Sequence, residues 1–372
     1  VVPGRGSVGA SGDLAPLALL ALPLLGRGEV RVGGRRRPAA EALREAGLEP
    51  VTLAAREGLA LINGTQAMTS LLALTLIEGE RLARVADLVG AFSCDAFRGT
   101  DAAFDARVHE VRPHPGQRAS ASNLWSLLRG SGIRESHRTA DVRVQDPYSF
   151  RCMPQVHGAV RDALADAERK VRIEMNSATD NPLVFAEDGE AISGGNFHGE
   201  PMALAADFVA IALAELGSIA ERRIEKLTNA SFSGLPPFLV AEAGLNSGFM
   251  IAQVTAAALA SENKTLAHPA SVDSIPTSAD KEDHVSMGMW AALKVGRVAL
   301  NVRRILAVEL VAAAQGIDLL RPLRSSEPLE RLHAAVRQRV PAWIEDREMA
   351  PDLAAAEELI ASGLDGLLEG LG

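Results

Sequence analysis

A glycine-rich loop opens the sequence, and its residue types and spacing suggest two kinds of chemistry, dinucleotide binding and nucleophilic catalysis. Residues 4–9 match the G-x-G-x-x-G pattern of dinucleotide-binding loops, and Glu29 follows at the spacing of a ribose-binding acid. A strand must precede such glycines, but only two apolar residues do, and no βαβ alternation follows. Residues 9–12 also fail as a nucleophile elbow, because Asp13 stands where G-x-S-x-G needs its last glycine. Judged by its glycine content alone, this segment is therefore better explained as a plain loop than as a dinucleotide site.

A second polar cluster, Glu282, Asp283 and His284, contains residue types that bind metals or form hydrolase triads. Consecutive residues on a helix point in different directions, so these neighbours are not expected to converge on one ligand. A solvated helix start, with acids near the positive end of the helix dipole, explains them equally well. The two cysteines, Cys94 and Cys152, lack C-x-x-C spacing and favour neither a zinc site nor a disulfide framework. We therefore expect no metal site.

A third polar segment, residues 145–152, has the features of a helix start. Asp146 is predicted to cap a helix whose first residue is Pro147. Tyr148 and Arg151 are then i, i+3 neighbours on one helical face. Taken alone, a capped helix with a surface arginine explains this segment as well as a binding site does.

Residues 9–17, Gly-Ala-Ser-Gly-Asp-Leu-Ala-Pro-Leu, resemble the signature of the aromatic amino acid ammonia-lyases. In that family Ala-Ser-Gly cyclises and loses two waters to form the electrophilic group 4-methylideneimidazol-5-one (MIO). The resemblance assigns this reaction to Ala10, Ser11 and Gly12. The residue types suit it, because the glycine nitrogen is the least hindered backbone nucleophile and the serine hydroxyl can be lost to create a methylene. The resemblance implies no metal and no diffusible cofactor.

The resemblance extends over essentially the whole chain, through residues 61–66, 145–152 and 193–201. It implies that Asn63 holds the amino-acid end of the substrate and that Gln145 and catalytic Tyr148 surround the MIO. Phe197 is expected to pack beside the MIO and the substrate. Arg151 is expected to bind the substrate carboxylate, which its planar guanidinium can hold in a bidentate way.

Residues 278–288 resemble the family members that act on histidine, whereas those that act on phenylalanine usually have an amide-rich version. A carboxylate at Glu282 can accept a hydrogen bond from an imidazole N–H. The resemblance therefore implies elimination of ammonia from L-histidine to give trans-urocanate, the first step of histidine degradation. It also implies a homotetramer whose active sites are shared between subunits. Lys281 departs from the family pattern, so a tyrosine or phenylalanine lyase or aminomutase remains an alternative. A catalytically inactive lyase-like subunit is another.

The sequence contains a single tyrosine, Tyr148. The resemblance implies a second tyrosine, from a segment ahead of Ala-Ser-Gly, as the base that removes the β-proton of the substrate. Only nine residues precede Ala10, and the chain begins with Val1, so we expect an N-terminal segment of the enzyme to lie outside it. Because a positioned base is worth about 10²–10⁴-fold, residues 1–372 alone are expected to have little or no activity.

Apolar periodicity predicts an all-α fold, a bundle of long helices with small β embellishments. No linker divides the sequence, so residues 1–372 are expected to form a single helical domain. Residues 111–146 are polar and serine-rich and are expected to form loops with helix fragments. Helices are predicted for residues 16–26, 59–87, 202–227, 250–266 and 286–319, a hairpin for residues 181–193, and a polar turn or short hairpin for residues 29–38.

The composition restricts the class of protein. It is 47% hydrophobic and only 4% aromatic, which favours packed helices. The formal net charge of −9 argues against a nucleic-acid partner. Residues 14–25 resemble the apolar part of a secretory signal, but they contain Pro16 and Pro23 and are shorter than the roughly 20 residues that span a bilayer. We therefore expect a cytoplasmic enzyme without a membrane partner.

Overall fold

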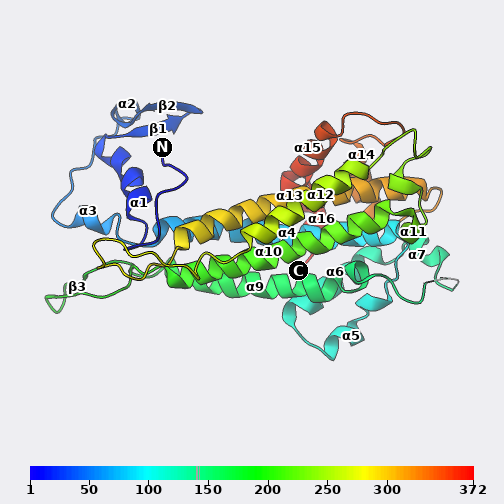
Figure 1. Ribbon diagram of the computed structural model, residues 1–372, viewed down its shortest axis with the longest axis horizontal. Coiled ribbons are helices and arrows are strands. Elements are labelled where there is room, and N and C mark those ends of the chain that lie inside the picture. Colours follow the sequence, from blue (N-terminus) through cyan, green and yellow to red (C-terminus); the bar gives the residue numbers. More distant parts are fainter. Residues whose placement is uncertain (140, 142) are drawn as a thin grey trace. The chain divides into compact units, whose positions relative to one another are not determined.

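The computed structural model describes residues 1–139, 141 and 143–372, which form two compact units. Unit 1 comprises residues 1–76, 166–209 and 268–296, and unit 2 comprises residues 77–165, 210–267 and 297–372. Four of the five unit boundaries fall inside long helices labelled in Figure 1, namely α4 (Gln66–Ala96), α9 (Met153–Glu174), α10 (Glu200–Thr228) and α13 (Gly288–Leu319), and the fifth follows the end of α12 (Met250–Leu266). An uninterrupted helix has no linker composition, so the sequence carries no sign of these boundaries. The prediction of one domain stays a prediction.

The predicted all-α class is confirmed, and the two predicted hairpins are present. In the first, β1 (Glu29–Val32) pairs with β2 (Arg35–Pro38), and in the second, β3 (Leu183–Phe185) pairs with β4 (Glu190–Ile192). The remaining α-helices are α1 (Leu14–Ala21), α2 (Ala39–Glu45), α3 (Glu57–Ala60), α5 (Ala106–Glu110), α6 (Pro115–Leu128), α7 (Gly132–Ser136), α8 (Tyr148–Arg151), α11 (Ala230–Ser233), α12 (Met250–Leu266), α14 (Glu327–Arg337), α15 (Ala350–Glu358) and α16 (Asp365–Leu368).

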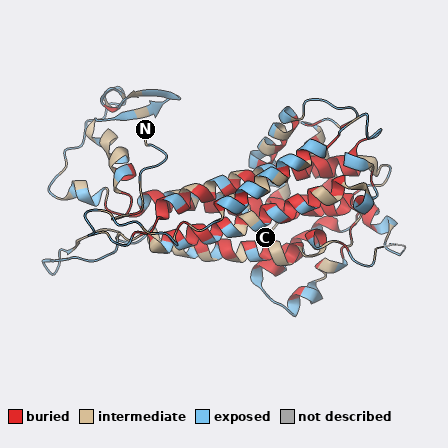
Figure 2. Cartoon of the chain, viewed as in Figure 1, coloured by how far each residue is buried: buried red, intermediate tan, exposed pale blue. Residues whose placement is uncertain are grey.

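Unit 2 is built on close packing between long helices. At Gly79 of α4, an added Cβ would lie 2.9 Å from Leu164 of α9. At Gly217 of α10, it would lie 3.2 Å from both Val302 and Ile305 of α13. Each of these helices therefore turns a buried face towards its neighbours, as the red inner surfaces of Figure 2 show. Burying each large aliphatic side chain in such a core contributes about 1.5–3 kcal/mol.

Unit 1 has a small apolar cluster that joins three helix starts. Leu17 of α1, Ala67 of α4 and Met289 of α13 are buried together, with Ile62 and Leu293 packed against them. Residues 10–12, 63–64 and 282–284 lie just ahead of these three starts. This cluster therefore holds together three loops that are far apart in the sequence.

The prediction for residues 111–146 is wrong in part, because α6 is a regular helix of 14 residues. Its polar residues bind other polar groups in the interior of unit 2. Asn123 Nδ2 donates to Asp87 Oδ2 (2.8 Å), and Arg161 Nε donates to Ser120 Oγ (3.1 Å). Tertiary hydrogen bonds thus stabilise a helix whose composition is typical of a loop. The helix predicted over residues 59–87 is interrupted, because residues 61–65 form turns between α3 and α4.

Helix α10 is apolar on more than its buried face. Among the described residues it is the one helix long and apolar enough to cross a membrane, judged by length and composition. Within the most apolar 18-residue stretch of α10, 56% is buried inside the protein, as in the core helix of a bundle. Leu216 is fully buried, whereas Leu204, Phe208 and Ile211 are each about half exposed. These three residues form an apolar stripe along one side of α10.

Candidate active site

The Ala10–Ser11–Gly12 tripeptide forms a tight turn that only glycine can complete. Ser11 has a φ of +51°, which costs a non-glycine residue roughly 1–2 kcal/mol, and Gly12 has a φ of +73°. A Cβ at Gly12 would lie 2.1 Å from Gly64 O, so no side chain fits there. Residues 10–13 form a turn in which both Ser11 and Gly12 have left-handed backbone angles. The residues therefore fit the ring closure that forms an MIO.

Asp13 fastens this turn to the start of α4. Its backbone N–H donates to Gly64 O (3.0 Å), and its carboxylate accepts from Met68 N (3.0 Å) and Ser7 Oγ (2.8 Å). Asp13 is completely buried, and burial raises the pKa of its carboxyl. The sequence analysis assigned it no role. Its position directly after Ala-Ser-Gly and its charge beside an apolar run were the signals available.

Glu282 reaches the same turn from a distant part of the sequence. Ser11 Oγ donates to Glu282 Oε1 at 2.7 Å. Ser278 Oγ (2.6 Å) and Thr277 Oγ1 (2.8 Å) donate to the other carboxylate oxygen, Oε2. The bonds from Ser278, Ser11 and Thr277, in that order, lower the pKa of Glu282. Glu282 is therefore ionised at neutral pH.

The segment that carries Glu282 is a strained turn and not the solvated helix start considered above. Thr277 and Glu282 form an isolated antiparallel bridge, and α13 begins only at Gly288. Between Thr277 and Glu282, the residues Ser278, Ala279 and Asp280 have φ values of +52°, +54° and +63°. Three consecutive non-glycine residues in the left-handed region are unusual, and such strain is concentrated at functional sites.

Asn63 is buried and already engaged within unit 1. Its Nδ2 donates to Asp180 Oδ1 (2.9 Å) and to Asn181 O (3.0 Å), and it is 4% exposed. Arg56 Nη1 donates to the second oxygen of Asp180 (2.9 Å). Because Nδ2 is engaged by Asp180 and Asn181, the side-chain carbonyl oxygen of Asn63 is the atom available to contact a substrate. Asp180 is a site residue that the sequence analysis missed.

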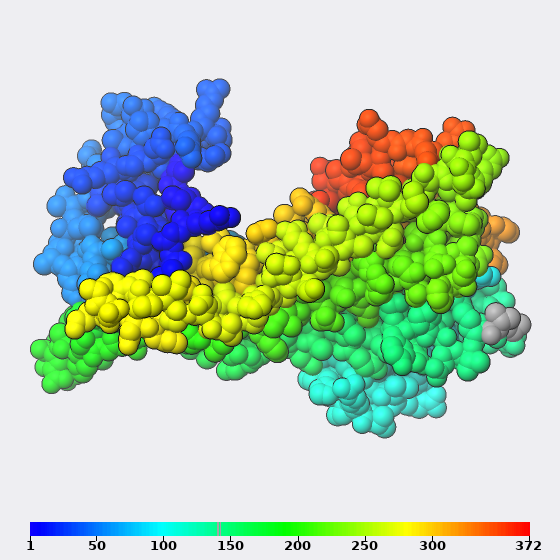
Figure 3. Space-filling view, in the orientation of Figure 1, coloured from blue at the N-terminus to red at the C-terminus, as the bar shows by residue number. Residues whose placement is uncertain are grey.

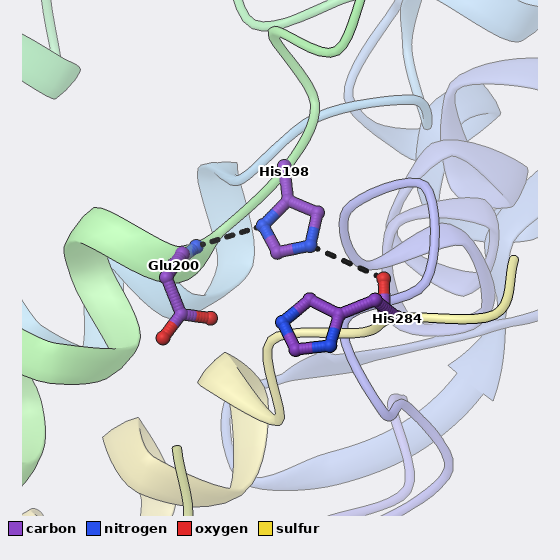
Figure 4. Close-up of side chains that lie close together, drawn as sticks. All are labelled: His198, Glu200 and His284. Carbon is purple, nitrogen blue, oxygen red and sulfur yellow. Dashed lines mark hydrogen bonds between the residues drawn. The ribbon is translucent and has the colours of Figure 1, made fainter. Parts of the chain in front are cut away.

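Figure 4 shows that His198 is hydrogen-bonded to the backbone of both Glu200 and His284, so it links the start of α10 to the loop ahead of α13. His198 Nδ1 accepts from the Glu200 backbone N–H (3.3 Å), so Nε2 carries the proton and donates to His284 O (3.2 Å). Potential ligand atoms of His198, Glu200 and His284 lie within 4.8 Å of one another. Both ring nitrogens of His198 are occupied, so a metal ion would have to break one of these bonds. The contacts favour a positioning role for His198.

Gln145, Tyr148 and Arg151 belong to unit 2. Tyr148 is 70% exposed, and the Arg151 guanidinium carbon lies 4.7 Å from the centroid of its ring. This contact confirms that the two side chains share one face of α8. Phe150, on the opposite side, is fully buried and stacks on Phe97 at 4.3 Å. Phe150 therefore anchors α8 and leaves Tyr148 open to a ligand.

The predicted cap of α8 is wrong. The helix begins at Tyr148 with Pro147 at the N-cap position and no side-chain cap. Asp146 Oδ2 instead accepts from the backbone N–H of Thr100 (2.7 Å), and burial raises the pKa of Asp146. A partner distant in the sequence has thus replaced the local capping bond. Gln145 and Tyr148 line a cavity of about 880 Å³ in unit 2, whose cationic groups are Arg98, Arg143 and Lys226.

The sequence matches the model of the family described as Aromatic amino acid lyase over residues 1–338. The chain belongs to the aromatic amino acid lyase family. It is 57% identical to histidine ammonia-lyase of Koribacter versatilis, over 98% of this chain and 73% of that protein. It is 58% identical to histidine ammonia-lyase of Sorangium cellulosum, over 97% of this chain and 71% of that protein.

Solved lyase-family structures share the fold. Histidine ammonia-lyase from Trypanosoma cruzi superimposes with a TM-score of 0.91 at 48% identity, covering 99% of this chain and 70% of that one. Tyrosine aminomutase from Streptomyces globisporus gives a TM-score of 0.91 at 43% identity, covering 97% of this chain and 72% of that one. The lyase fold is therefore common to enzymes named for different reactions, and substrate choice must be argued from side chains.

The predicted site residues of this lyase-family chain fall into two groups. Ala10, Ser11, Gly12, Asn63, Phe197 and Glu282 lie in unit 1, and Gln145, Tyr148 and Arg151 lie in unit 2. Within unit 1, Ser11 and Glu282 are in direct contact. Phe197 is half-buried in the turn that leads into α10. The roles of all nine residues stay predictions.

Proposed function

We propose that this lyase-family chain is a histidine ammonia-lyase, which converts L-histidine to trans-urocanate and ammonia in the first step of histidine degradation. The observation that carries the proposal is the ionised carboxylate of Glu282 beside Ser11. In this position one carboxylate borders both the reactive tripeptide and any ring bound next to it. Curated relatives at 57% and 58% identity that are named histidine ammonia-lyase support the same substrate.

The proposed prosthetic group is an MIO derived from Ala10, Ser11 and Gly12. The left-handed turn and the crowding of Gly12 against Gly64 support this assignment. When formed, the group supplies an electrophile that no ordinary side chain offers. The enzyme requires no metal and no diffusible cofactor in this scheme.

The remaining residues bind and orient the substrate. Arg151 holds the carboxylate, Asn63 contacts the amino-acid end through its carbonyl oxygen, and Phe197 packs against the ring. Glu282 accepts a hydrogen bond from the imidazole N–H, which the ring of phenylalanine cannot offer. Fixing both ends of the substrate removes much of the entropy cost of reaching the reactive geometry.

We further propose a cytoplasmic homotetramer in which Gln145 and Tyr148 of one subunit complete the site of another. Exposed apolar surface supports this arrangement, since large apolar patches on soluble proteins usually mark interfaces. This surface includes the α10 stripe defined above and Ile251 and Val254 of α12, which lies on the face shown in Figure 3 in yellow-green.

The test combines intact mass with product formation by the full-length protein. The measured mass of the wild type should be lower than the mass calculated from its sequence by two waters, and this deficit should be localised to residues 10–12. The wild type should also form urocanate from L-histidine. Ser11→Ala should fold, show no deficit and lose activity by several orders of magnitude. A wild type of unaltered mass, or near-normal turnover by Ser11→Ala, would overturn the proposal. An unaltered mass would instead favour the inactive lyase-like subunit.

An aminomutase is the second candidate, favoured by Lys281 beside Glu282, where the sequence departs from the pattern of the lyases that act on histidine. It would convert tyrosine or phenylalanine to the β-amino acid. Incubation with each of the three amino acids, followed by product analysis, separates the two functions. Formation of a β-amino acid without urocanate would select the aminomutase.

A further inference from the structure

The contact between Ser11 and Glu282 is made by the serine hydroxyl itself, whose Oγ donates to Glu282 Oε1 at 2.7 Å. Among the described residues, Glu282 is the one side chain hydrogen-bonded to Ser11 Oγ. This hydroxyl is the group that must leave when an MIO forms. Glu282 therefore touches a reacting atom of maturation before any substrate is present.

The carboxylate is held rigidly in this position. Its second oxygen accepts bonds from Thr277 and Ser278, and the left-handed turn of residues 278–280 fixes the backbone. On the other side, Asp13 and Gly64 hold the turn that carries Ser11. Both partners are thus preorganised, as a site for proton transfer requires.

We propose that Glu282 is a catalytic residue of maturation, which carries a proton from the Cα of Ser11 to its departing hydroxyl. The proposal rests on the proposed function, because it concerns the formation of the same prosthetic group. Its substrate is the chain itself. It gives Glu282 a second role, ahead of its contact with the imidazole of histidine.

The two dehydrations balance as follows. In ring closure the Gly12 nitrogen bonds to the Ala10 carbonyl carbon, and the carbonyl oxygen leaves as water with the amide hydrogens of Gly12 and Ser11. In the second step the Cα–H and Cβ–Oγ bonds of Ser11 break and a Cα=Cβ double bond forms. Glu282 takes the Cα proton and returns it to Oγ, which leaves as water. Glu282 ends ionised, as it began, and nothing is oxidised or reduced.

The lowered pKa of Glu282 supports this role, because only the ionised carboxylate can accept a proton. Loss of Oγ also removes the donor from Oε1. That oxygen then becomes available to the N–H of an imidazole. The serine hydroxyl therefore occupies, in the immature chain, the hydrogen-bonding position that the substrate ring takes later.

The experiment follows maturation by intact mass and so needs no activity. Wild type, Glu282→Gln and Glu282→Ala are purified under identical conditions, with Asp283→Asn as the matched control because it removes a neighbouring exposed carboxylate. Wild type and Asp283→Asn should lack two waters. Both Glu282 variants should lack at most one, because the second dehydration slows by about 10²–10⁴-fold. Circular dichroism and Tm verify folding.

The outcomes separate this proposal from the proposed function. A full two-water deficit in Glu282→Ala, reached at the wild-type rate, would overturn the maturation role and leave the lyase intact. An undiminished wild-type mass would overturn both. Glu282→Gln, which preserves the size of the side chain, decides the question if the alanine variant does not fold.

Discussion

Replacing Gly12 by alanine should damage both the stability of unit 1 and the closure of the ring. An alanine at a φ of +73° costs roughly 1–2 kcal/mol. Its Cβ would lie 2.1 Å from Gly64 O, so the turn must shift away from Gly64. That shift breaks the bond from Asp13 N to Gly64 O, at a cost of about 1–3 kcal/mol for buried groups. The sum is a destabilisation of about 2–5 kcal/mol.

The assay is thermal unfolding followed by intact mass. At roughly 2 °C per kcal/mol for a large domain, Gly12→Ala should lower the Tm by about 4–10 °C. It should also retain both waters, because the methyl group hinders the attacking nitrogen. Gly4→Ala is the matched control, since Gly4 lies in the same loop with open space around its Cα and no positive φ. An unchanged Tm together with a two-water deficit in Gly12→Ala would refute the reasoning.

Three further predictions follow from individual contacts. Glu282→Gln should reduce kcat/KM for histidine by about ten- to a hundred-fold per matured chain, and for phenylalanine far less; equal losses would exclude ring recognition. Burial raises the pKa of Asp95 to about 6, so its contribution to stability is present below pH 4 and is lost as the pH rises through 6. As the pH rises from 4 to 6, the free energy of unfolding of Asp95→Asn, measured by denaturant titration, should therefore increase by about 3 kcal/mol relative to that of the wild type. A stability difference between the two proteins that does not change with pH would contradict this. Arg223 and Glu309 are fully buried, and the guanidinium donates to Oε1 (2.5 Å) and Oε2 (2.9 Å) of the carboxylate. Arg223→Met should therefore lower the free energy of unfolding by about 3–5 kcal/mol, and adding Glu309→Leu should restore most of that loss. A double variant no more stable than Arg223→Met would mean that the loss comes from packing.

The trio of side chains in Figure 4 illustrates why residue types alone mislead. His198, Glu200 and His284 include the ligand types of a zinc site. The hydrogen bonds of His198 instead connect two loops, one beside Phe197 and the other beside Glu282. Removing the ring with His198→Ala would therefore disturb the positions of both residues.

Local patterns determined most of the secondary structure. Residues 250–266 were predicted as a helix with the bounds that α12 has, and the hairpin around residues 183–192 was found from two apolar runs and an Asp-Gly turn. These signals depend on side chains within a few positions of one another. The same holds for the Ala-Ser-Gly signature and for the shared face of Tyr148 and Arg151.

Elements stabilised by distant partners were predicted poorly. Helix α6 is rich in serine, and its place in the fold depends on Asp87 and Arg161 from other helices. Asp146 has the sequence context of a helix cap, yet it binds Thr100. In each case a long-range hydrogen bond outweighs the local preference, and a single sequence does not reveal such a partner.

The sequence by itself determined which residues could do the chemistry, and the tertiary structure decided which of them meet. Ser11 and Glu282 are 271 positions apart, and their contact depends on the packing of Leu17, Ala67 and Met289 beneath the loops that carry them. The bond between Asn63 and Asp180 and the left-handed turn before Glu282 likewise arise only in the folded chain. Residue identity is a local property, whereas distance and strain are set by the burial of apolar surface throughout the unit, which no short segment encodes.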